Sequence, residues 1–148
     1  MPHTALHYAL VSLDDLPALA DLRVAAMRES LEALGRFDPV RARQRLIEGF
    51  VPEHARHIET PTERIGFYVL QPELDALHLK HFYFWPQHSG QGHGRTVMLA
   101  LQAQARAAGL PLRLNALRGS RANDFYRACG FIEEHADPLD VYYRWRAD

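Results

Sequence analysis

The residues of this sequence with the clearest chemical potential are three glycines in one short loop. Residues 90–94 read Gly-Gln-Gly-His-Gly, directly ahead of a segment with helical periodicity that begins near Arg95. Alternating glycines let the backbone turn sharply and expose successive N–H groups with no Cβ atom in the way. The N-terminus of the following helix adds about half a positive charge at the same place. The loop therefore predicts a binding site for a phosphate or diphosphate group, with a plain turn between strand and helix as the alternative.

Two familiar nucleotide-binding loops do not fit this spacing. The loop of nucleoside-triphosphate-binding proteins requires Gly-Lys-Ser or Gly-Lys-Thr, whereas Gly94 is followed by Arg95 and Thr96. The dinucleotide-binding fingerprint requires Gly-x-Gly-x-x-Gly and an acidic residue about 20 positions further on. Here the spacing is Gly-x-Gly-x-Gly, and residues 110–114 hold no carboxylate. The sequence thus argues against both motifs.

A second group of chemically interesting residues lies in the segment 120–131. Ser120 is a suitable N-cap for a short helix, and Gly130 is a suitable residue to end it. One face of that helix is apolar and is expected to be buried; it consists of Ala122, Phe125 and Cys129. Tyr126 lies one step round the helix, where its hydroxyl can face a cleft. A packed aromatic ring with a solvated tip is the alternative for this tyrosine.

The rest of the chain alternates between strand and helix periodicity. Strands are expected at residues 6–10, 56–59, 64–71, 77–84, 110–117, 131–134 and 141–145. Helices are expected at residues 16–34, 39–49, 95–107 and 120–128. Ser12 and Asp15 form a capping-box pattern ahead of the first helix, and Gly66 permits close approach of another backbone. The order β-α-α-β-β-β-α-β-α-β-β predicts an α/β protein with a central mixed sheet and helices on both faces.

Composition restricts the class of protein further. The 148 residues suit one domain, and 17 Lys and Arg against 18 Asp and Glu give a formal charge of −1, which argues against duplex nucleic acid as a partner. The single cysteine, Cys129, excludes an intrachain disulfide and multi-cysteine zinc clusters, and favours the cytoplasm. No apolar run is long enough to span a membrane, so no membrane partner is expected. No set of His and carboxylate residues has metal-ligand spacing, so no metal is predicted.

The two motifs, in this order, resemble one family: the GNAT superfamily of N-acetyltransferases. Its phosphate loop usually reads Arg/Gln-Gly-x-Gly-x-Gly or -Ala after a strand that ends near a proline; here Pro86 precedes Ser-Gly-Gln-Gly-His-Gly at residues 89–94. Its later helix commonly reads Ala-x-x-Phe/Leu-Tyr-x-x-x-Gly-Phe, and residues 122–131 match that pattern. There are two departures. Ser89 replaces the usual Arg or Gln, and Gly119 stands where the family often has Asn.

The resemblance implies one acetyltransferase domain over residues 1–148, with the GNAT-like fold. It also implies direct transfer of an acetyl group from acetyl-CoA to a primary amine in a ternary complex. Main-chain groups at residues 82–84 would pair with the amide-rich arm of the cofactor and stabilise the oxyanion. Asn115 or Asn123 would replace the hydrogen bonds of the missing family Asn. The implied cofactor-binding residues are Phe82, Tyr83, Phe84, Ser89, Gly90, Gln91, Gly92, His93, Gly94, Arg95, Thr96, Asn115, Asn123 and Tyr126.

The same resemblance implies two proton transfers. Tyr126, by its family position, would protonate the leaving thiolate. The attacking amine must be neutral, and because an alkyl ammonium has a pKa of about 10.4, a base is required. Many relatives carry a carboxylate on the strand before the loop, where this chain has His78, Lys80 and His81. His81 is the candidate base, and the alternatives are a half-buried histidine of the sheet and a base elsewhere, such as water.

In this family the N-terminal helices and the last strands usually line the acceptor site. The implied candidates are Arg23, Met27, Arg28, Glu29, Glu32, Phe37, Tyr142, Tyr143 and Trp145. The acceptor is expected to be a small-molecule or peptide amine, and the sequence does not separate a polyamine, an amino acid, an antibiotic and a protein N-terminus. A homodimer is compatible with the family. A non-catalytic acyl-CoA sensor on the same fold, and an interaction domain whose glycine loop is only a turn, are the alternative functions.

Overall fold

The computed structural model describes residues 5–147, which fall into two compact units. The first unit comprises the residues up to 69 together with 81–89, and the second comprises 70–80 together with the residues from 90 onward. Two strands, Arg64–Pro72 and Leu77–Phe84, contribute to both units. The predicted glycine loop also crosses the division, because Ser89 belongs to the first unit and Gly90 to the second.

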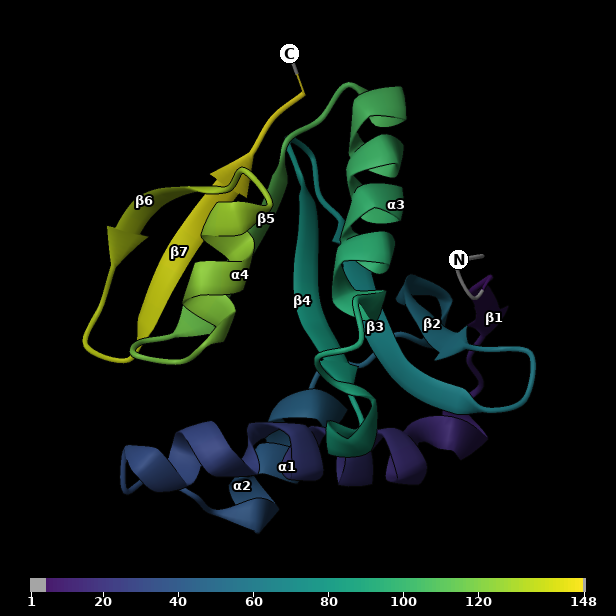
Figure 1. The fold of residues 1–148 in the computed structure, drawn as a ribbon, viewed down its shortest axis with the longest axis vertical. Helices are drawn as coiled ribbons and strands as arrows, with labels where there is room; N and C mark the ends of the chain where they lie inside the picture. The colour runs from purple at the N-terminus through teal and green to yellow at the C-terminus, as the bar shows by residue number, and fades with distance from the viewer. Residues whose placement is uncertain (1–4, 148) are drawn as a thin grey trace. The chain divides into compact units, whose positions relative to one another are not determined.

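The helices and strands follow the order that the sequence predicts (Figure 1). The strands are β1 (His7–Leu10), β2 (Ala55–Glu59), β3 (Arg64–Pro72), β4 (Leu77–Phe84), β5 (Leu112–Leu117), β6 (Ile132–Ala136) and β7 (Asp140–Trp145). The α-helices are α1 (Leu16–Ala33), α2 (Pro39–Ile47), α3 (His93–Ala108) and α4 (Ala122–Ala128). The strand order is β1-β2-β3-β4-β5-β7-β6, with β4 and β5 parallel and β1–β2, β2–β3, β5–β7 and β6–β7 antiparallel. The predicted α/β class with a mixed sheet is confirmed.

Most element boundaries differ from the sequence prediction by one or two residues, and two of these differences have a clear local cause. Helix α3 begins at His93, two residues early, because Gly92 takes a left-handed conformation with φ 83° and ends the loop there. Strand β6 begins at Ile132, one residue late, because the Phe131 N–H donates to the Tyr126 carbonyl and keeps Phe131 folded against α4. In both cases the boundary is set by a local turn at a helix end.

The core of the first unit lies between the helix pair α1–α2 and strands β2 and β3. Its buried residues are Val11, Leu19, Ala20, Leu22, Leu46, Ala55, Phe67 and Val69. Helix α2 begins as predicted, with Pro39 in its first turn and the Asp38 side chain accepting the N–H groups of Val40 and Arg41. This cap satisfies backbone donors that have no partner inside the helix.

A capping interaction at Asp15 also forms as predicted. Its carboxylate accepts the Ser12 N–H at 2.9 Å and lies 3.0 Å from Nε2 of His57, which is buried. The Ser12 N–H and then the His57 hydrogen bond lower the pKa of the Asp15 carboxyl to about 2. The turn before α1 is therefore tied to β2 by a polar contact.

In the second unit, α3 buries one face and α4 is anchored at its C-terminal end. The buried residues of α3 are Val97, Met98, Leu101, Gln102 and Ala105. The Gln102 amide donates to the carbonyl of Cys129 at 2.9 Å, which satisfies an acceptor at the end of α4. Strand β5 pairs with β7 from Leu112–Trp145 to Leu117–Asp140.

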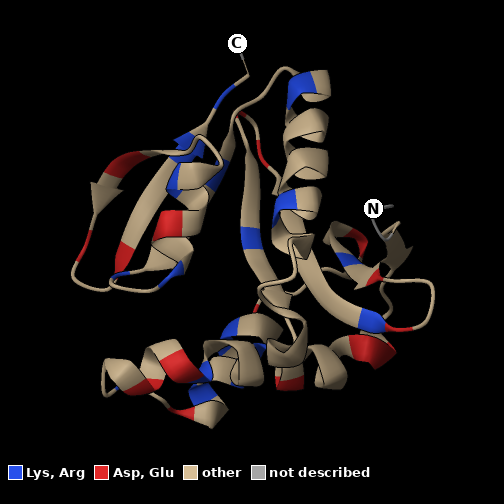
Figure 2. Ribbon diagram, in the orientation of Figure 1, with Lys and Arg blue, Asp and Glu red and all other residues tan. Residues whose placement is uncertain are grey.

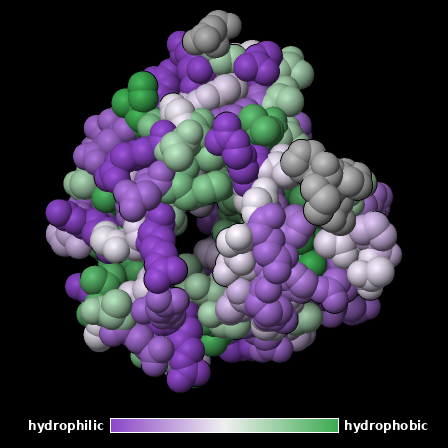
Figure 3. Space-filling model, in the orientation of Figure 1, coloured by the Kyte–Doolittle hydropathy of each residue, from purple (hydrophilic) through white to green (hydrophobic). Residues whose placement is uncertain are grey.

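The apolar side chains are gathered mainly in the cores of the two units. On the face that Figure 3 shows, hydrophilic residues predominate and apolar residues are dispersed among them. None of the helices formed by residues 5–147 combines the length and the apolar content that crossing a bilayer requires.

Gly66 in β3 is the position where the sheet leaves no room for a side chain. A Cβ atom at Gly66 would lie 2.4 Å from the carbonyl oxygen of Tyr83 and 2.9 Å from Cδ1 of Phe84. Beside this contact, the Trp85 N–H donates to the carbonyl of Ile65 at 2.9 Å. The close backbone approach that the sequence predicts at Gly66 is confirmed.

This geometry predicts that Gly66→Ala destabilises the protein more than an alanine placed in open space. The new Cβ must displace the β4 backbone, and we expect a loss of about 3 kcal/mol in the free energy of unfolding, measured with urea. Gly49→Ala is the matched control, because Gly49 has φ 70° but nothing within 4 Å of its Cβ position. Its loss should stay near ~1 kcal/mol, the cost of the left-handed conformation alone. Equal losses in the two variants would contradict the steric account.

Candidate functional site

The glycine loop of the second unit has the open, left-handed geometry that an anion site requires. Gly90 and Gly92 have φ values of 74° and 83°, a conformation that side chains with a Cβ rarely adopt. A Cβ atom at either position would have nothing within 4 Å, so the space above the loop is open. A diphosphate group could therefore approach the main chain directly.

The start of α3 adds polarity to this loop. The first hydrogen bond of the helix runs from the Thr96 N–H to the Gly92 carbonyl, so the N–H groups ahead of Thr96 precede the helical ladder. The Thr96 hydroxyl donates to the same carbonyl at 3.3 Å. Arg95 and Arg106, near the two ends, are the only Lys, Arg, Asp or Glu residues of α3 (Figure 2). The loop end of the helix thus combines a positive helix dipole with one guanidinium group.

The amide of Asn123 is engaged at the junction between β5 and α4. Its nitrogen donates to the carbonyls of Leu117 and Ser120 at 2.9 and 3.0 Å, and its oxygen accepts the Tyr143 hydroxyl at 2.8 Å. Asn123 is 6% exposed and Tyr143 is fully buried. Asn123 therefore stabilises the loop that follows β5 through these hydrogen bonds.

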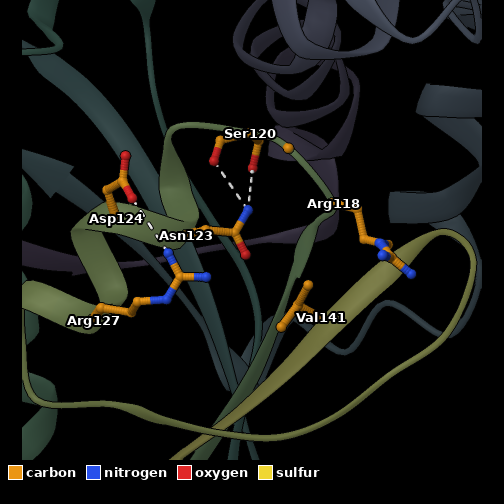
Figure 4. A pocket seen from close by; sticks show the side chains of 7 residues that line it. Arg118, Ser120, Asn123, Asp124, Arg127 and Val141 are labelled. Carbon is orange, nitrogen blue, oxygen red and sulfur yellow. Dashed lines mark hydrogen bonds and ion pairs between the residues drawn. The ribbon is translucent and has the colours of Figure 1, made fainter.

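A pocket of about 230 Å³ opens beside this junction (Figure 4). It is lined by Arg118, Gly119, Ser120, Asn123, Asp124, Arg127 and Val141. Arg127 pairs with Asp124 across one helical turn, and an Arg118 N–H donates to the Asp137 carbonyl. The lining therefore carries both positive and negative side chains, and its two arginines already have partners within the protein.

Tyr126 is more enclosed than its place on α4 suggests from the sequence. It is 8% exposed, and its ring packs against those of Phe125, Phe131 and Tyr143 with centroid distances of 5.5, 5.8 and 6.2 Å. The Phe131 ring reaches it because the chain turns back after Gly130. Its role as an acid remains a prediction.

In the first unit, β4 brings the side chains of His81 and Tyr83 together. Nδ1 of His81 lies 3.1 Å from the hydroxyl of Tyr83, as expected for residues two apart on one face of a strand. Nε of Arg23, from α1, donates to the same hydroxyl at 3.1 Å. Sequence reasoning assigned only the main chain of Tyr83 to the site. The shared face of His81 and Tyr83 was the signal for this pair, whereas Arg23 was predicted only as a candidate acceptor residue and not as a partner of the pair.

The predicted acceptor residues lie on α1, on β7 and, for Phe37, in the segment between α1 and α2. On α1, Arg28 pairs with Glu32 at 3.3 Å and lies over the ring of Phe37, while Met27 is half-buried and Glu29 is exposed. On β7, the Tyr142 hydroxyl donates to Asp137, which raises the pKa of Tyr142. Their contact with an acceptor remains a prediction.

Two further predicted cofactor residues have defined local surroundings. Asn115 is exposed on β5 and stands opposite Tyr142 in the β5–β7 register. The Ser89 hydroxyl donates to the Pro86 carbonyl at 2.8 Å, which closes the turn before the glycine loop within the first unit. The Ser89 side chain thus has a partner in the protein itself.

Comparison with known proteins places this chain in a family. The family model described as an acetyltransferase (GNAT) domain matches residues 52–133, more than half of the chain. The chain belongs to the GNAT acetyltransferase family. This confirms the resemblance that the glycine loop and the segment 122–131 indicate, and the protein is an acetyltransferase of the family that uses acetyl-CoA as its donor. No curated protein matches the sequence.

Solved structures of this family share the fold. The PaiA N-acetyltransferase of Thermoplasma acidophilum, in complex with coenzyme A, superposes with a TM-score of 0.74 at 16% identity, over 97% of this chain and 99% of that one. An acetyltransferase of Thermus thermophilus gives 0.73 at 21% identity, over 99% and 100%. The ribosomal-protein-S18-alanine N-acetyltransferase of Escherichia coli gives 0.70 at 17% identity, over 96% and 94%. At these identities the likeness establishes the fold.

The hydrogen bonds of Asn123 predict that its substitution lowers stability strongly and that this loss is coupled to the loss of the Tyr143 hydroxyl. Asn123→Ala leaves the buried Tyr143 hydroxyl and two carbonyls without their partner, and we expect a loss of about 2–3 kcal/mol in the free energy of unfolding. Asp124→Ala, in which an exposed ion pair is lost, should cost less than ~1 kcal/mol. The double variant Asn123→Ala/Tyr143→Phe should lose less free energy of unfolding than the sum of the two single losses. The reason is that both substitutions remove the same hydrogen bond between Tyr143 and Asn123. Strict additivity in urea unfolding would contradict this coupling.

Proposed function

We propose that this acetyltransferase transfers the acetyl group of acetyl-CoA directly to a primary amine within a ternary complex. The observation that carries the proposal is the open, left-handed glycine loop at the N-terminus of α3. Membership of the GNAT family supports the reaction class. The mode of attack, the acceptor and the roles of the individual residues are our inference.

The glycine loop fits the diphosphate of coenzyme A. The space above Gly90 and Gly92 is one that a Cβ atom would fill, and the helix dipole favours an anion there. In this proposal the main-chain N–H groups from Gly90 to Arg95 bind the diphosphate oxygens. The Arg95 guanidinium adds a positive charge at the same end of α3.

The main chain of β4 is proposed to bind the amide-containing arm of the cofactor. Among the described residues, the registered pairing of β4 with β5 consists of Leu77–Leu112 and His78–Arg113. These two pairs lie at the start of β4, and the family resemblance assigns the cofactor arm to the later part of the strand, residues 82–84. A strand edge can bind an extended chain of amides through main-chain hydrogen bonds. An N–H group in this segment would also stabilise the oxyanion of the thioester carbonyl.

The remaining chemistry consists of two proton transfers. The cofactor, when bound, supplies an activated acetyl thioester. His81 is the proposed base that accepts a proton from the amine, because an imidazole titrates near neutral pH. Tyr126 is the proposed acid that donates its hydroxyl proton to the departing thiolate sulfur. Its enclosed ring holds the phenol in one position, which favours proton transfer to a fixed partner.

The proposed diphosphate site predicts that Gly92→Ala abolishes binding of coenzyme A, whereas the control Gly109→Ala does not. Gly92→Ala places a methyl group in the space proposed for the diphosphate. Gly109→Ala, at the other end of α3, introduces the same kind of strain at φ 68° and also has open space around it. Both variants should lose stability, but only Gly92→Ala should lose the rise in Tm that coenzyme A produces. Ligand at 100 times its Kd adds about 2.7 kcal/mol to the free energy of unfolding of the wild type. A full Tm rise in folded Gly92→Ala would refute the cradle.

The catalytic part is tested by acetyl transfer across a panel of amines, with Tyr126→Phe as the diagnostic variant. We expect turnover to fall at least ~100-fold while the affinity for acetyl-CoA changes little, because only the hydroxyl is lost. Tyr8→Phe, on β1, is the matched control and should retain wild-type turnover. Unaltered turnover in Tyr126→Phe would remove Tyr126 from the acid role. Binding of acetyl-CoA without transfer to any amine would indicate an acyl-CoA sensor in place of an enzyme.

A further inference from the structure

Three polar side chains of the first unit form a chain of hydrogen bonds. The Arg23 guanidinium can only donate, so the Tyr83 oxygen accepts from Arg23 Nε at 3.1 Å. The Tyr83 hydroxyl keeps its own proton for a second bond. Nδ1 of His81 lies 3.1 Å from the hydroxyl and accepts that proton when the imidazole is protonated on Nε2. In this tautomer the bonds run from Arg23 to Tyr83 and from Tyr83 to His81.

The Nε2-protonated tautomer of His81 is the one that suits a base at this place. A neutral imidazole has one protonated and one unprotonated nitrogen. With the proton on Nε2, the lone pair through which His81 can act as a base is the one on Nδ1, and it faces the Tyr83 hydroxyl. His81 cannot accept a proton from an amine directly without losing that bond.

Arg23 is held in place firmly enough to maintain this arrangement. It is 7% exposed, its NH1 group donates to the Ala42 carbonyl of α2 at 2.7 Å, and its guanidinium carbon lies 5.6 Å from the centre of the Tyr83 ring. No carboxylate pairs with it within the described part of the chain. Its positive charge is therefore available to stabilise negative charge on the Tyr83 oxygen.

We infer that Tyr83 is a catalytic proton relay between the acceptor amine and His81, and that Arg23 is its positioning residue. The inference rests on the proposed function. The acceptor ammonium loses one N–H bond and its proton goes to the Tyr83 oxygen. The former Tyr83 O–H bond breaks in the same step, and its proton forms the Nδ1–H bond of His81. The amine gains a lone pair for attack, His81 becomes an imidazolium, and it later releases the proton to water.

The phenol oxygen has the capacity for this role. It has two acceptor sites and one donor: Arg23 uses one acceptor site, His81 takes the donor, and the second acceptor site can receive the amine proton. Tyr83 is half-buried, with its ring packed 5.7 Å from that of Phe67. The oxygen is thus fixed by packing and by two hydrogen bonds at one end of the side chain.

The experiment compares Tyr83→Phe with Tyr8→Phe in the acetyl-transfer assay, using the best amine of the panel. Tyr83→Phe keeps the ring and removes only the hydroxyl, so the fold and the KM for acetyl-CoA should be unchanged. We expect kcat to fall about 100-fold, the scale of one lost acid–base step. In mixtures of H₂O and D₂O, the wild-type rate should show the curved dependence of two protons in motion, and Tyr83→Phe should lose that curvature. Tyr8→Phe should match the wild type in both measurements.

The role of Arg23 is tested by charge rescue. Arg23→Met should lower kcat, and Arg23→Lys, which restores a cationic donor, should recover most of the loss at equal thermal stability. Arg45→Met, at an exposed position on α2, is the control and should have no effect. If the wild type acetylates an amine and Tyr83→Phe retains its kcat and its curvature, the relay is refuted while the proposed function stands. If the wild type binds acetyl-CoA but acetylates no amine, the proposed function fails, and the relay fails with it.

Discussion

At Gly66 the backbones of β3 and β4 approach more closely than any Cβ atom permits. The carbonyl that faces Gly66 belongs to Tyr83, so this contact sets the position of the residue whose side chain reaches Arg23 and His81. The same stretch of β4 continues to Trp85, whose N–H is held by the Ile65 carbonyl. A backbone contact without a side chain thus positions this polar network of the first unit. A side chain there would move the network and the strand together.

The second unit uses its polar groups in two different ways. At the β5–α4 junction, the Asn123 amide bonds to the protein itself, which suits a rigid support for Tyr126 on the same helix. At the start of α3, Gly90 and Gly92 leave the space next to the main chain open. The polar side chain at the junction thus serves the protein's own structure, whereas the loop leaves room for a group from outside the chain.

The sequence predicted those parts of the fold that depend on near neighbours in the chain. The capping interaction at Asp15 and the turn at Gly130 that ends α4 each need only a few consecutive residues. The family resemblance came from two such local motifs. The buried face of α4 was predicted wrongly: Ala122, Phe125 and Cys129 are half-buried, whereas Asn123 and Tyr126 are the buried residues. The ring of Tyr126 is enclosed because Phe131 folds back and Tyr143 arrives from β7. A helical position indicates the direction of a side chain but not what covers it.

The order of elements, the glycine loop and the family were determined by the sequence alone, since each is encoded by local spacing, by periodicity or by short motifs. The tertiary structure decided which polar atoms meet. Arg23 and Tyr83 are 60 positions apart, and Asn123 and Tyr143 are 20 apart. No rule of spacing pairs them, because residues so distant in the chain are brought together only when helices and strands pack their apolar faces. The direction of the bond from Arg23 to Tyr83 follows from that packing, since a buried guanidinium must donate to whatever acceptor the fold places beside it.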